Sequence, residues 1–343
     1  MKKICYLVSY NGLSNAGGVE KVCFYLNSIM SKKGYNVLVI DKDFIEKYRF
    51  GRLYKGFLGK IHIVAFTFLA SLYVKTHRKK GDILIAHGFN APFFKIDYLF
   101  LHGTMKGYII KTKAVASGKN RILFYLERKA VLNAEKILAV SQNAIEEVKK
   151  YYTAKPKKYY IVNNGVDASA FYPLERKKEV ITVLYCGRLD KGKGLADILK
   201  LAEEIEGREG YRFCIACNNP NNIELFKDLR KTEINVGVTI NNINEFYNSG
   251  DVLFFPSHYE GFEMVTLEAL SAGIPVLGNN VGAVSELVRK KEPGVELIDK
   301  SDLFAQINRI VKEFQDKKEF LHSYYSEKYC LDAYTEKLNK IIK

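Results

Sequence analysis

The chain has 343 residues, of which 48% are hydrophobic and 27% charged, with seven prolines and six cysteines. This length predicts two domains, and the composition excludes disordered, collagenous and disulfide-rich chains. The first half carries the positive charge: residues 1–172 contain 29 Lys and Arg against 11 Asp and Glu, and the remainder contains 24 against 27. We therefore expect the first half to meet an anionic partner, either nucleic acid or an acidic membrane surface.

The N-terminus leads directly into a short apolar run, without the pattern of a signal peptide. The longest apolar stretch, residues 61–74, is too short to cross a bilayer as a helix. The cysteines are scattered, and Cys214 and Cys217 lie on one predicted strand, where residues three apart point to opposite faces and do not chelate one metal. These features favour a cytoplasmic protein with reduced thiols, either soluble or peripheral.

The first half predicts alternating strands and helices. A strand at 4–9 runs into a glycine-bearing loop, and a helical pattern follows it. Further strands are expected at 36–40, 82–86, 98–102 and 136–140. Strands this apolar are typical of a parallel sheet that is covered on both faces.

Two features of the first half are candidates for a site. The amides of Gly17 and Gly18 open the first helix and are placed to meet a phosphate or an acceptor hydroxyl, whereas Glu20 is explained equally well by the helix dipole. This loop lacks the GxGxxG spacing, so a Rossmann dinucleotide site is not predicted. His102 ends a predicted parallel strand, where ligands bind, although a lone histidine there is more often a structural hydrogen-bonder. The other five histidines show no pairing.

The second half predicts a second strand–helix series, with strands at 181–186, 211–217, 236–240, 252–255 and 274–277. The turn after the first of these strands holds Arg188 and Lys193 among three glycines. Arginine offers a planar fork and lysine a point charge, so together they can neutralise a departing diphosphate. Taken alone, a basic glycine-rich turn is more often solvated surface.

The most informative segment joins the strand at 252–255 to a helix that runs to about residue 272. Gly261 lets the backbone approach a ligand, and the first helical amides point outward toward an anion. Glu260 precedes the helix, and Glu268 lies about two turns along it, within about 80° of the same face. Two carboxylates beside a phosphate loop suit recognition of sugar hydroxyls. The structural alternative is a capping carboxylate and a solvated glutamate.

In order and spacing, these pieces resemble a retaining glycosyltransferase of family 4, of the bacterial envelope or capsule type, over residues 10 to 290. The resemblance implies an α/β protein of the GT-B fold, in which two doubly wound Rossmann-like domains face a central cleft. It implies an acceptor-side domain at 1–170, a nucleotide-sugar-binding domain at 171–325, and a C-terminal helix at 326–343 that packs back on the first domain.

The resemblance also assigns roles to the candidate residues. Glu268 would bind the ribose, and Glu260 a hydroxyl of the donor sugar. Arg188 and Lys193 would bind the diphosphate, and His102 would lie beside the donor sugar. Gly17 and Gly18 would lie near the phosphate and the acceptor. The loop of Gly261, Phe262, Glu263 and Met264 would contact the sugar and the phosphate. The family often has Gly or Pro where this chain has Glu263, so this carboxylate is expected either to point away or to help select the donor sugar.

The resemblance implies a transferase that moves a hexose or N-acetylhexosamine from a nucleotide-diphosphate sugar, with UDP expected, to a saccharide or lipid-linked acceptor. No metal and no other cofactor is expected. Basic and aromatic stretches at 49–57, 75–80 and 106–129 favour contact with the anionic inner face of the cell membrane. The alternatives are a GT-B nucleotide-sugar epimerase, a sugar phosphorylase and a basic nucleic-acid-binding protein; the last lacks a recognition module, so nucleic acid is not expected as a partner.

Overall fold

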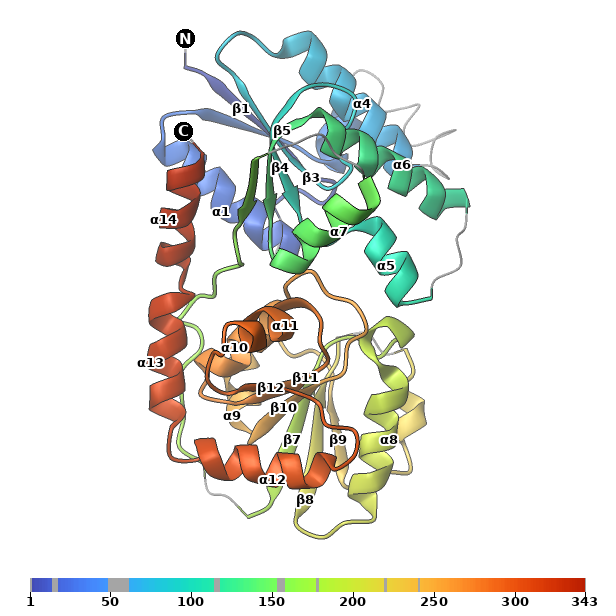
Figure 1. Cartoon of the computed structure of the whole chain (residues 1–343), viewed down its shortest axis with the longest axis vertical. Coiled ribbons are helices and arrows are strands. Elements are labelled where there is room, and N and C mark those ends of the chain that lie inside the picture. The colour runs from blue at the N-terminus through green and yellow to red at the C-terminus, as the bar shows by residue number, and fades with distance from the viewer. Residues whose placement is uncertain are drawn as a thin grey trace. The chain divides into compact units, whose positions relative to one another are not determined.

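The computed structural model describes residues 2–13, 18–48, 62–113, 118–152, 158–176, 179–218, 221–239 and 241–342. The chain forms two compact units: Met1–Asn164 with Thr335–Lys343, and Gly165–Tyr334 (Figure 1). The second domain predicted from the sequence spans residues 171–325. The observed second unit, Gly165–Tyr334, starts earlier and ends later.

The first unit contains a six-stranded parallel sheet with the order β2-β1-β3-β4-β5-β6. Its strands are β1 (Ile4–Val8), β2 (Asn36–Ile40), β3 (Ile83–His87), β4 (Ile96–Leu101), β5 (Ala134–Ala139) and β6 (Lys158–Ile161). Its helices are α1 (Gly18–Lys32), α2 (Lys42–Lys47), α4 (His62–His77), α5 (Met105–Lys111), α6 (Gly118–Asn133), α7 (Gln142–Tyr152) and the end of α14 (Leu331–Ile341). Helix α1 lies on one side of the sheet and α4, α6 and α7 on the other (Figure 1).

The core of the first unit forms where alternate strand residues meet α4, α6 and α7. Tyr6, Leu84 and Leu99 from neighbouring strands pack with Phe66 of α4 and Val131 of α6. Burial on this scale drives folding, because each large apolar side chain removed from water contributes about 1.5–3 kcal/mol. The sheet is thereby fixed as a platform for the loops that follow its strands.

The second unit has the sheet order β12-β11-β10-β7-β8-β9, again parallel throughout. Its strands are β7 (Ile181–Cys186), β8 (Tyr211–Ala216), β9 (Thr232–Asn235), β10 (Val252–Phe255), β11 (Val276–Gly278) and β12 (Val295–Leu297). Its helices are η2 (Lys191–Lys193), α8 (Leu195–Glu206), η3 (Ile223–Phe226), α9 (Ile243–Asn248), α10 (Met264–Ser271), α11 (Gly282–Arg289), α12 (Leu303–Phe314) and α13 (Lys318–Lys328). Each unit is thus a doubly wound α/β sheet, as the sequence predicts.

One predicted strand is wrong, and three observed strands, β6, β9 and β12, were not predicted. The strand expected at 236–240 is absent over the described residues 236–239; β9 precedes it, and Val236 is exposed. Strands β6 and β12 were missed. All three real strands lie at sheet edges, where one flank of the backbone has no neighbour and apolar residues are fewer.

The last residues of the chain return to the first unit. The ammonium group of Lys33 donates to the carbonyl of Ile342 over 2.6 Å, and Lys136 donates to the carbonyl of Ile341 over 3.3 Å. Helix α13, in contrast, packs against α10 of the second unit. Within the described part of the chain, every helix is too short or too polar to span a membrane.

Candidate functional site

The strand order of the second unit places β7 beside β10. From β7 the chain winds outward through β8 and β9 on one side, and β10, β11 and β12 follow on the other. In open parallel sheets, ligands bind at the carboxyl ends of the strands, where the winding direction changes. The candidate residues from Arg188 to Glu268 all follow these two strands.

The loops after β7 and β10 touch through their backbones. The amide of His258 donates to the carbonyl of Gly192 over 2.9 Å. Gly194 has a φ of +82°, and a Cβ atom there would lie 2.3 Å from the carbonyl oxygen of Pro256. Only glycine admits both this conformation and this approach. The glycines of the turn therefore bring its two basic residues to the loop that carries the carboxylates.

Lys193 and Glu260 form an ion pair between these loops. Lys193 Nζ contacts Glu260 Oε1, and the same oxygen accepts a hydrogen bond of 2.7 Å from Ser257 Oγ. The Lys193 side chain is 21% exposed and the Glu260 side chain 13%. Lys193 Nζ also lies 5.8 Å from the ring centroid of Phe255. A ligand anion would therefore compete with Glu260 for this ammonium group.

Arg188 differs from Lys193 because its side chain is 65% exposed. Its Nε atom lies 3.2 Å from Asp190 Oδ2, and its carbonyl accepts a hydrogen bond of 2.6 Å from the hydroxyl of Tyr185. Exposed ion pairs contribute roughly 0–1 kcal/mol, so exchanging Asp190 for a phosphate costs little. The backbone of Arg188 is thus held in place while its guanidinium group is available for an anion.

Glu268 lies on the buried face of α10. The residue is 6% exposed, and its Oε2 atom accepts a hydrogen bond of 2.9 Å from the hydroxyl of Tyr247. Burial, with the neighbouring Cys186 thiol and the Glu268 carboxylate, raises the pKa of Tyr247 well above its ordinary value. Glu260 precedes α10, as the sequence predicts, and the two carboxylates have different hydrogen-bond partners.

The loop from Glu260 enters α10 through Gly261 and Phe262. Phe262 is buried, whereas Gly261 and Met264 are half-buried. Helix α10 begins at Met264, and its N-cap, Glu263, makes no side-chain capping hydrogen bond to it. A helix start without such a cap leaves amides directed at a ligand, which is the arrangement that binds phosphate in many proteins.

The carboxylate of Glu263 is engaged by the next helix instead. It accepts hydrogen bonds from the amide of Ala283 over 2.8 Å, the amide of Val284 over 3.2 Å and the hydroxyl of Thr266 over 2.7 Å. A Cβ atom on Gly282 would lie 1.9 Å from this carboxylate. Burial, and secondarily the charge of Glu260, raises the pKa of Glu263 to about 7. Glu263 therefore links the start of α10 to the start of α11.

In the first unit, Gly17 lies outside the described residues, and Gly18 is the first residue of α1. Glu20, in the first turn of α1, is buried, and its Oε1 atom accepts a hydrogen bond of 2.7 Å from Asn11 Nδ2. The contact ties the loop after β1 to the helix. Glu20 thus has a structural role in addition to its favourable position at the positive end of the helix.

His102 is paired, contrary to the sequence-based reading of the histidines. Its Nε2 atom lies 2.9 Å from His87 Nδ1, and His87 Nε2 lies 3.3 Å from Cys23 Sγ. Strands β3 and β4 are neighbours, with His87 opposite Phe100. Since the carboxyl ends of parallel strands meet at one sheet edge, the adjacency of β3 and β4 was the signal that could have paired the two histidines.

The described residues contain no group of three or more His, Cys, Asp or Glu side chains arranged to hold a metal ion. None of the six cysteines forms a disulfide, and Cys214 and Cys217 are buried. The set of ligands that a structural zinc site needs is thus lacking in this part of the chain.

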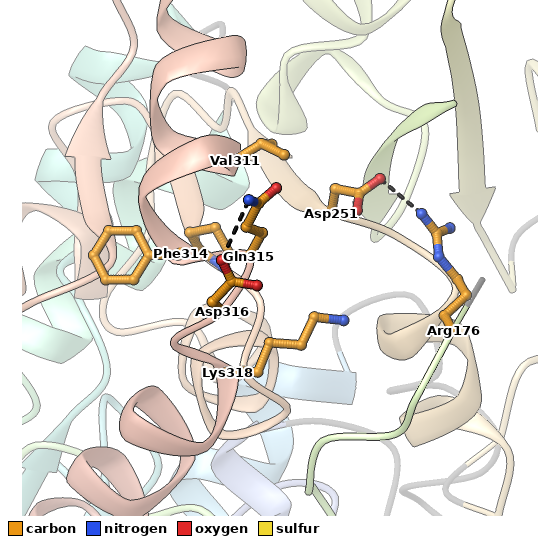
Figure 2. Close-up of a pocket in the computed structure, with 9 residues that line it drawn as sticks. Arg176, Asp251, Val311, Phe314, Gln315, Asp316 and Lys318 are labelled. Carbon is orange, nitrogen blue, oxygen red and sulfur yellow. Dashed lines mark hydrogen bonds and ion pairs between the residues drawn. The ribbon is translucent and has the colours of Figure 1, made fainter. Parts of the chain in front are cut away.

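A cavity of about 290 Å³ lies elsewhere in the second unit (Figure 2). Its wall includes Asp251, which precedes β10, and Pro275, which precedes β11, so it is at the amino ends of the strands. Arg176 Nη2 and Asp251 Oδ2 form an ion pair of 2.7 Å in this wall. None of the candidate site residues lines the cavity, and its two basic and two acidic side chains sum to no net formal charge.

Comparison with known proteins identifies the family. Residues 16–170 match the family described as Glycosyltransferase Family 4, and residues 180–313 match the one described as Glycosyl transferases group 1. The chain belongs to glycosyltransferase family 4. It is therefore a glycosyltransferase, and the first match ends at residue 170, shortly after the second unit begins at Gly165.

This family 4 glycosyltransferase is similar to the amylovoran biosynthesis glycosyltransferase AmsD of Erwinia amylovora, with 24% identity over 98% of this chain and 99% of AmsD. Among solved structures, it is similar to WaaG, a glycosyltransferase involved in lipopolysaccharide biosynthesis, with a TM-score of 0.70 and 17% identity over 99% of both chains. It is also similar to Anabaena HepE in complex with UDP-glucose, with a TM-score of 0.68 and 13% identity over 99% of both chains. These likenesses confirm the GT-B fold.

Sequence reasoning on this glycosyltransferase missed the partners that hold its candidate residues. Ser257 donates to Glu260, and Tyr247 donates to Glu268. In the first unit, Asn11 donates to Glu20, and Cys23 contacts His87. Ser257 lies three residues before Glu260 in the same loop, so it was accessible to sequence analysis. Tyr247 was not, because it comes from a different helix and meets Glu268 only in the folded unit.

Proposed function

We propose that this glycosyltransferase transfers a hexose or N-acetylhexosamine from a UDP-linked sugar to a saccharide or lipid-linked acceptor in envelope polysaccharide or glycolipid synthesis. The observation that carries the proposal is the contact of Lys193 with Glu260 where the loops after β7 and β10 meet. The UDP-glucose bound by HepE supports the donor class. The role of AmsD in amylovoran synthesis supports the product class.

In the proposed reaction, the bond between the anomeric carbon and the diphosphate lengthens and negative charge grows on the leaving phosphate. Lys193 and Arg188 neutralise that charge, and the first amides of α10 add hydrogen bonds to it. Stabilisation that appears only as the bond breaks raises turnover rather than affinity. The acceptor oxygen bonds to the anomeric carbon on the face that the diphosphate leaves, and its proton passes to the departing phosphate, so the anomeric configuration is retained.

The carboxylates have binding roles in this proposal. Glu260, which is held by Ser257, accepts a hydrogen bond from a hydroxyl of the donor sugar once Lys193 turns to the diphosphate. Glu268 accepts one from the ribose. Metal independence is part of the proposal, because Arg188 and Lys193 supply positive charge at the diphosphate. Retention is checked by the anomeric coupling constant of the product, and metal independence by activity in excess chelator.

A screen of nucleotide sugars for release of nucleoside diphosphate, with and without membrane extract, tests the activity. We expect release that depends on the acceptor in the extract and that falls in the Lys193→Ala variant. Lys200→Ala is the matched control, because Lys200 is an exposed lysine of α8 whose partner is Glu204. Conversion of the donor to an isomer without release would indicate an epimerase, and a requirement for inorganic phosphate would indicate a phosphorylase.

The surface of α5 and α6 supports an acceptor at a membrane. The exposed apolar residues of this surface are Tyr108, Ile110, Ile122 and Tyr125. Between residues 103 and 129 the sequence has one acidic residue, Glu127, and that residue is buried, whereas Lys111, Lys119 and Arg121 are exposed. Apolar and basic side chains on one surface suit the interface of an anionic leaflet. The basic stretch expected at 49–57 lies outside the described residues.

We therefore propose peripheral binding of the α5–α6 surface to anionic membranes. Each basic residue near such a leaflet contributes about 1 kcal/mol, so two or three charge reversals weaken binding strongly. Co-sedimentation with phosphatidylcholine vesicles, with and without phosphatidylglycerol, is the assay. We expect binding that requires the anionic lipid, falls with salt and is lost in a Lys119→Glu, Arg121→Glu variant. Binding that is independent of lipid charge would contradict the proposal.

A further inference from the structure

Three side chains from different elements form one hydrogen-bonded row in the first unit. Cys23 comes from α1, His87 from the end of β3, and His102 from the residue after β4. The contacts are 3.3 Å from Cys23 Sγ to His87 Nε2 and 2.9 Å from His87 Nδ1 to His102 Nε2. Cys23 and His87 are fully buried and His102 is half-buried, so the row leads from the interior to the surface.

The geometry of the two rings is well defined. The planes of His87 and His102 differ by 15° and their centroids are 5.1 Å apart, so the hydrogen bond runs nearly in the common plane of the rings. The ring of His87 also lies against Phe100, with centroids 5.3 Å apart. A side chain packed in this way cannot turn over without disturbing the sheet. His87 therefore presents Nδ1 to His102 in a fixed direction.

The direction of the protons follows from the start of the row. Burial raises the pKa of Cys23 to about 12, so the thiol keeps its proton, and the Ser9 hydroxyl also hydrogen-bonds to it. A thiol that keeps its proton has an S–H group to donate to an unprotonated imidazole nitrogen. If His87 Nε2 accepts from Cys23, then His87 Nδ1 carries the hydrogen and donates to His102 Nε2. The proton of a neutral His102 is then on Nδ1.

His102 is neutral in this setting, because burial lowers its pKa to about 4. Burial and the neighbouring His102 also lower the pKa of His87 well below its ordinary value. Among the described residues, His102 has a hydrogen-bond partner at Nε2 and none at Nδ1. Its Nδ1–H group is thus the end of the row that remains for a ligand.

We propose that His87, supported by Cys23, is a positioning residue that fixes His102 as its Nδ1–H tautomer, so that His102 donates a hydrogen bond to a sugar or phosphate oxygen of the substrate. The inference rests on the proposed function for the identity of that substrate. Without His87, His102 reverts to the Nε2–H tautomer that imidazole favours in water, and Nδ1 can then only accept. A substrate oxygen without a proton would lose its donor.

The tautomer can be measured without any substrate. In the full chain labelled with ¹⁵N-histidine, long-range ¹H–¹⁵N spectra separate protonated from unprotonated ring nitrogens, and a His102→Asn spectrum assigns the signals among six histidines. We expect a protonated Nδ1 and an unprotonated Nε2 on His102 at pH 7.5. A protonated Nε2 in the wild-type chain would overturn the proposal, whether or not a sugar donor has been found.

Kinetic variants test the consequence. The side chain of His87→Asn carries an N–H donor at the position of Nδ1, whereas His87→Leu removes it. We expect His87→Leu to lower kcat/KM by roughly tenfold, the effect of one hydrogen bond, and His87→Asn to recover most of the loss. An equal loss in both variants would mean that His87 serves packing alone and would overturn the proposal.

Variants of Cys23 provide a second test of the proposal if His87→Leu fails to fold. Cys23→Ser retains a donor to His87 Nε2, and Cys23→Ala removes it. We expect the serine variant to keep the His102 tautomer and the alanine variant to show a mixture of the two. If both variants give the same His102 spectrum as the wild type, Cys23 does not influence the tautomer, and its part in the proposal would be overturned. If the wild-type chain is inactive with every nucleotide sugar tested, the result would instead count against the proposed function.

Discussion

The ammonium group of Lys193 lies against the carboxylate of Glu260, although the two residues follow different strands of the sheet. Their loops are held together by the hydrogen bond from His258 to Gly192, so the contact is built into the backbone. In the unliganded protein, the two groups neutralise each other. A diphosphate would take the place of Glu260 at Lys193 and leave the carboxylate to the sugar.

Lys193→Ala is expected to lower turnover. Loss of a hydrogen bond to a charged phosphate costs about 1.5–3 kcal/mol, or roughly ten- to hundredfold in kcat/KM. Because the charge develops as the bond breaks, kcat should fall more than donor affinity. Steady-state kinetics of this variant beside Lys200→Ala provide the measurement. A normal kcat with a raised KM would mean that Lys193 binds the ground state only.

Glu268→Gln is expected to weaken donor binding, by about 1.5–3 kcal/mol, and to leave kcat nearly unchanged. The amide oxygen of Gln still accepts from the hydroxyl of Tyr247, so the fold should keep its stability. Glu268→Ala should in addition lose about 1–3 kcal/mol of unfolding free energy, because a buried donor is left unpaired. Calorimetric titration with a nucleotide sugar and urea unfolding separate the two effects. Wild-type affinity in both variants would refute the ribose-binding role.

Glu263→Gly is expected to destabilise the second unit by about 1–3 kcal/mol, because the amides of Ala283 and Val284 lose their acceptor. Glu263→Gln, which keeps an oxygen for these amides, should lose less. Donor preference in a panel of nucleotide sugars should stay the same in both variants. A changed preference at unchanged stability would instead assign Glu263 to selection of the sugar.

Glu127 predicts a pH-dependent stability. Burial, and secondarily the charge of Glu147, raises the pKa of Glu127 from 4.5 to about 7, even though Tyr152 and the amide of Met105 donate to its carboxylate. An acid with a raised folded-state pKa stabilises the fold below its unfolded pKa, and that stability is lost as the pH rises through 7. We expect the free energy of unfolding to fall by on the order of 2 kcal/mol between pH 5 and pH 8.

The matched variant for this prediction is Glu127→Gln, whose amide oxygen can still accept from Tyr152 and Met105. Its unfolding free energy should change less with pH than that of the wild type. The raised pKa of Glu263 changes the stability of the second unit with pH in the same direction. The unfolding free energy of the double variant, Glu127→Gln with Glu263→Gln, should therefore change even less with pH. Urea unfolding at four pH values is sufficient. A wild-type stability that rises from pH 5 to pH 8 would contradict this account of both carboxyl groups.

The interior strands of both sheets could be predicted because their apolar runs are covered on both faces. The interior strands β7 and β10 have the predicted bounds, and so does β2, an edge strand with an apolar sequence, whereas the strand assigned to 236–240 was wrong and β9 was found before it. The segment Thr232–Asn235 is polar because it is an edge strand, which pairs only with β8. The apolar residues after it, such as the exposed Val236, have no sheet to enter.

In the candidate site, the residues themselves could be predicted from the sequence, but most of their hydrogen-bond partners could not. Glycine spacing predicted the turn with Arg188 and Lys193, because glycine is required where a backbone turns left-handed or approaches another. The partners of Glu263 could not be predicted, since they depend on how α10 and α11 pack. The pairing of His87 with His102 was within reach, because it follows from the order of adjacent strands.

The central claim is that a nucleotide-diphosphate sugar binds at the carboxyl ends of β7 and β10. A crystal structure of the chain with a non-transferable UDP-sugar analogue tests it most directly. We predict a diphosphate oxygen within hydrogen-bond distance of Lys193 Nζ, with the Lys193–Glu260 pair opened and Glu260 on a sugar hydroxyl. An analogue bound elsewhere, with Lys193 still on Glu260, would contradict the account.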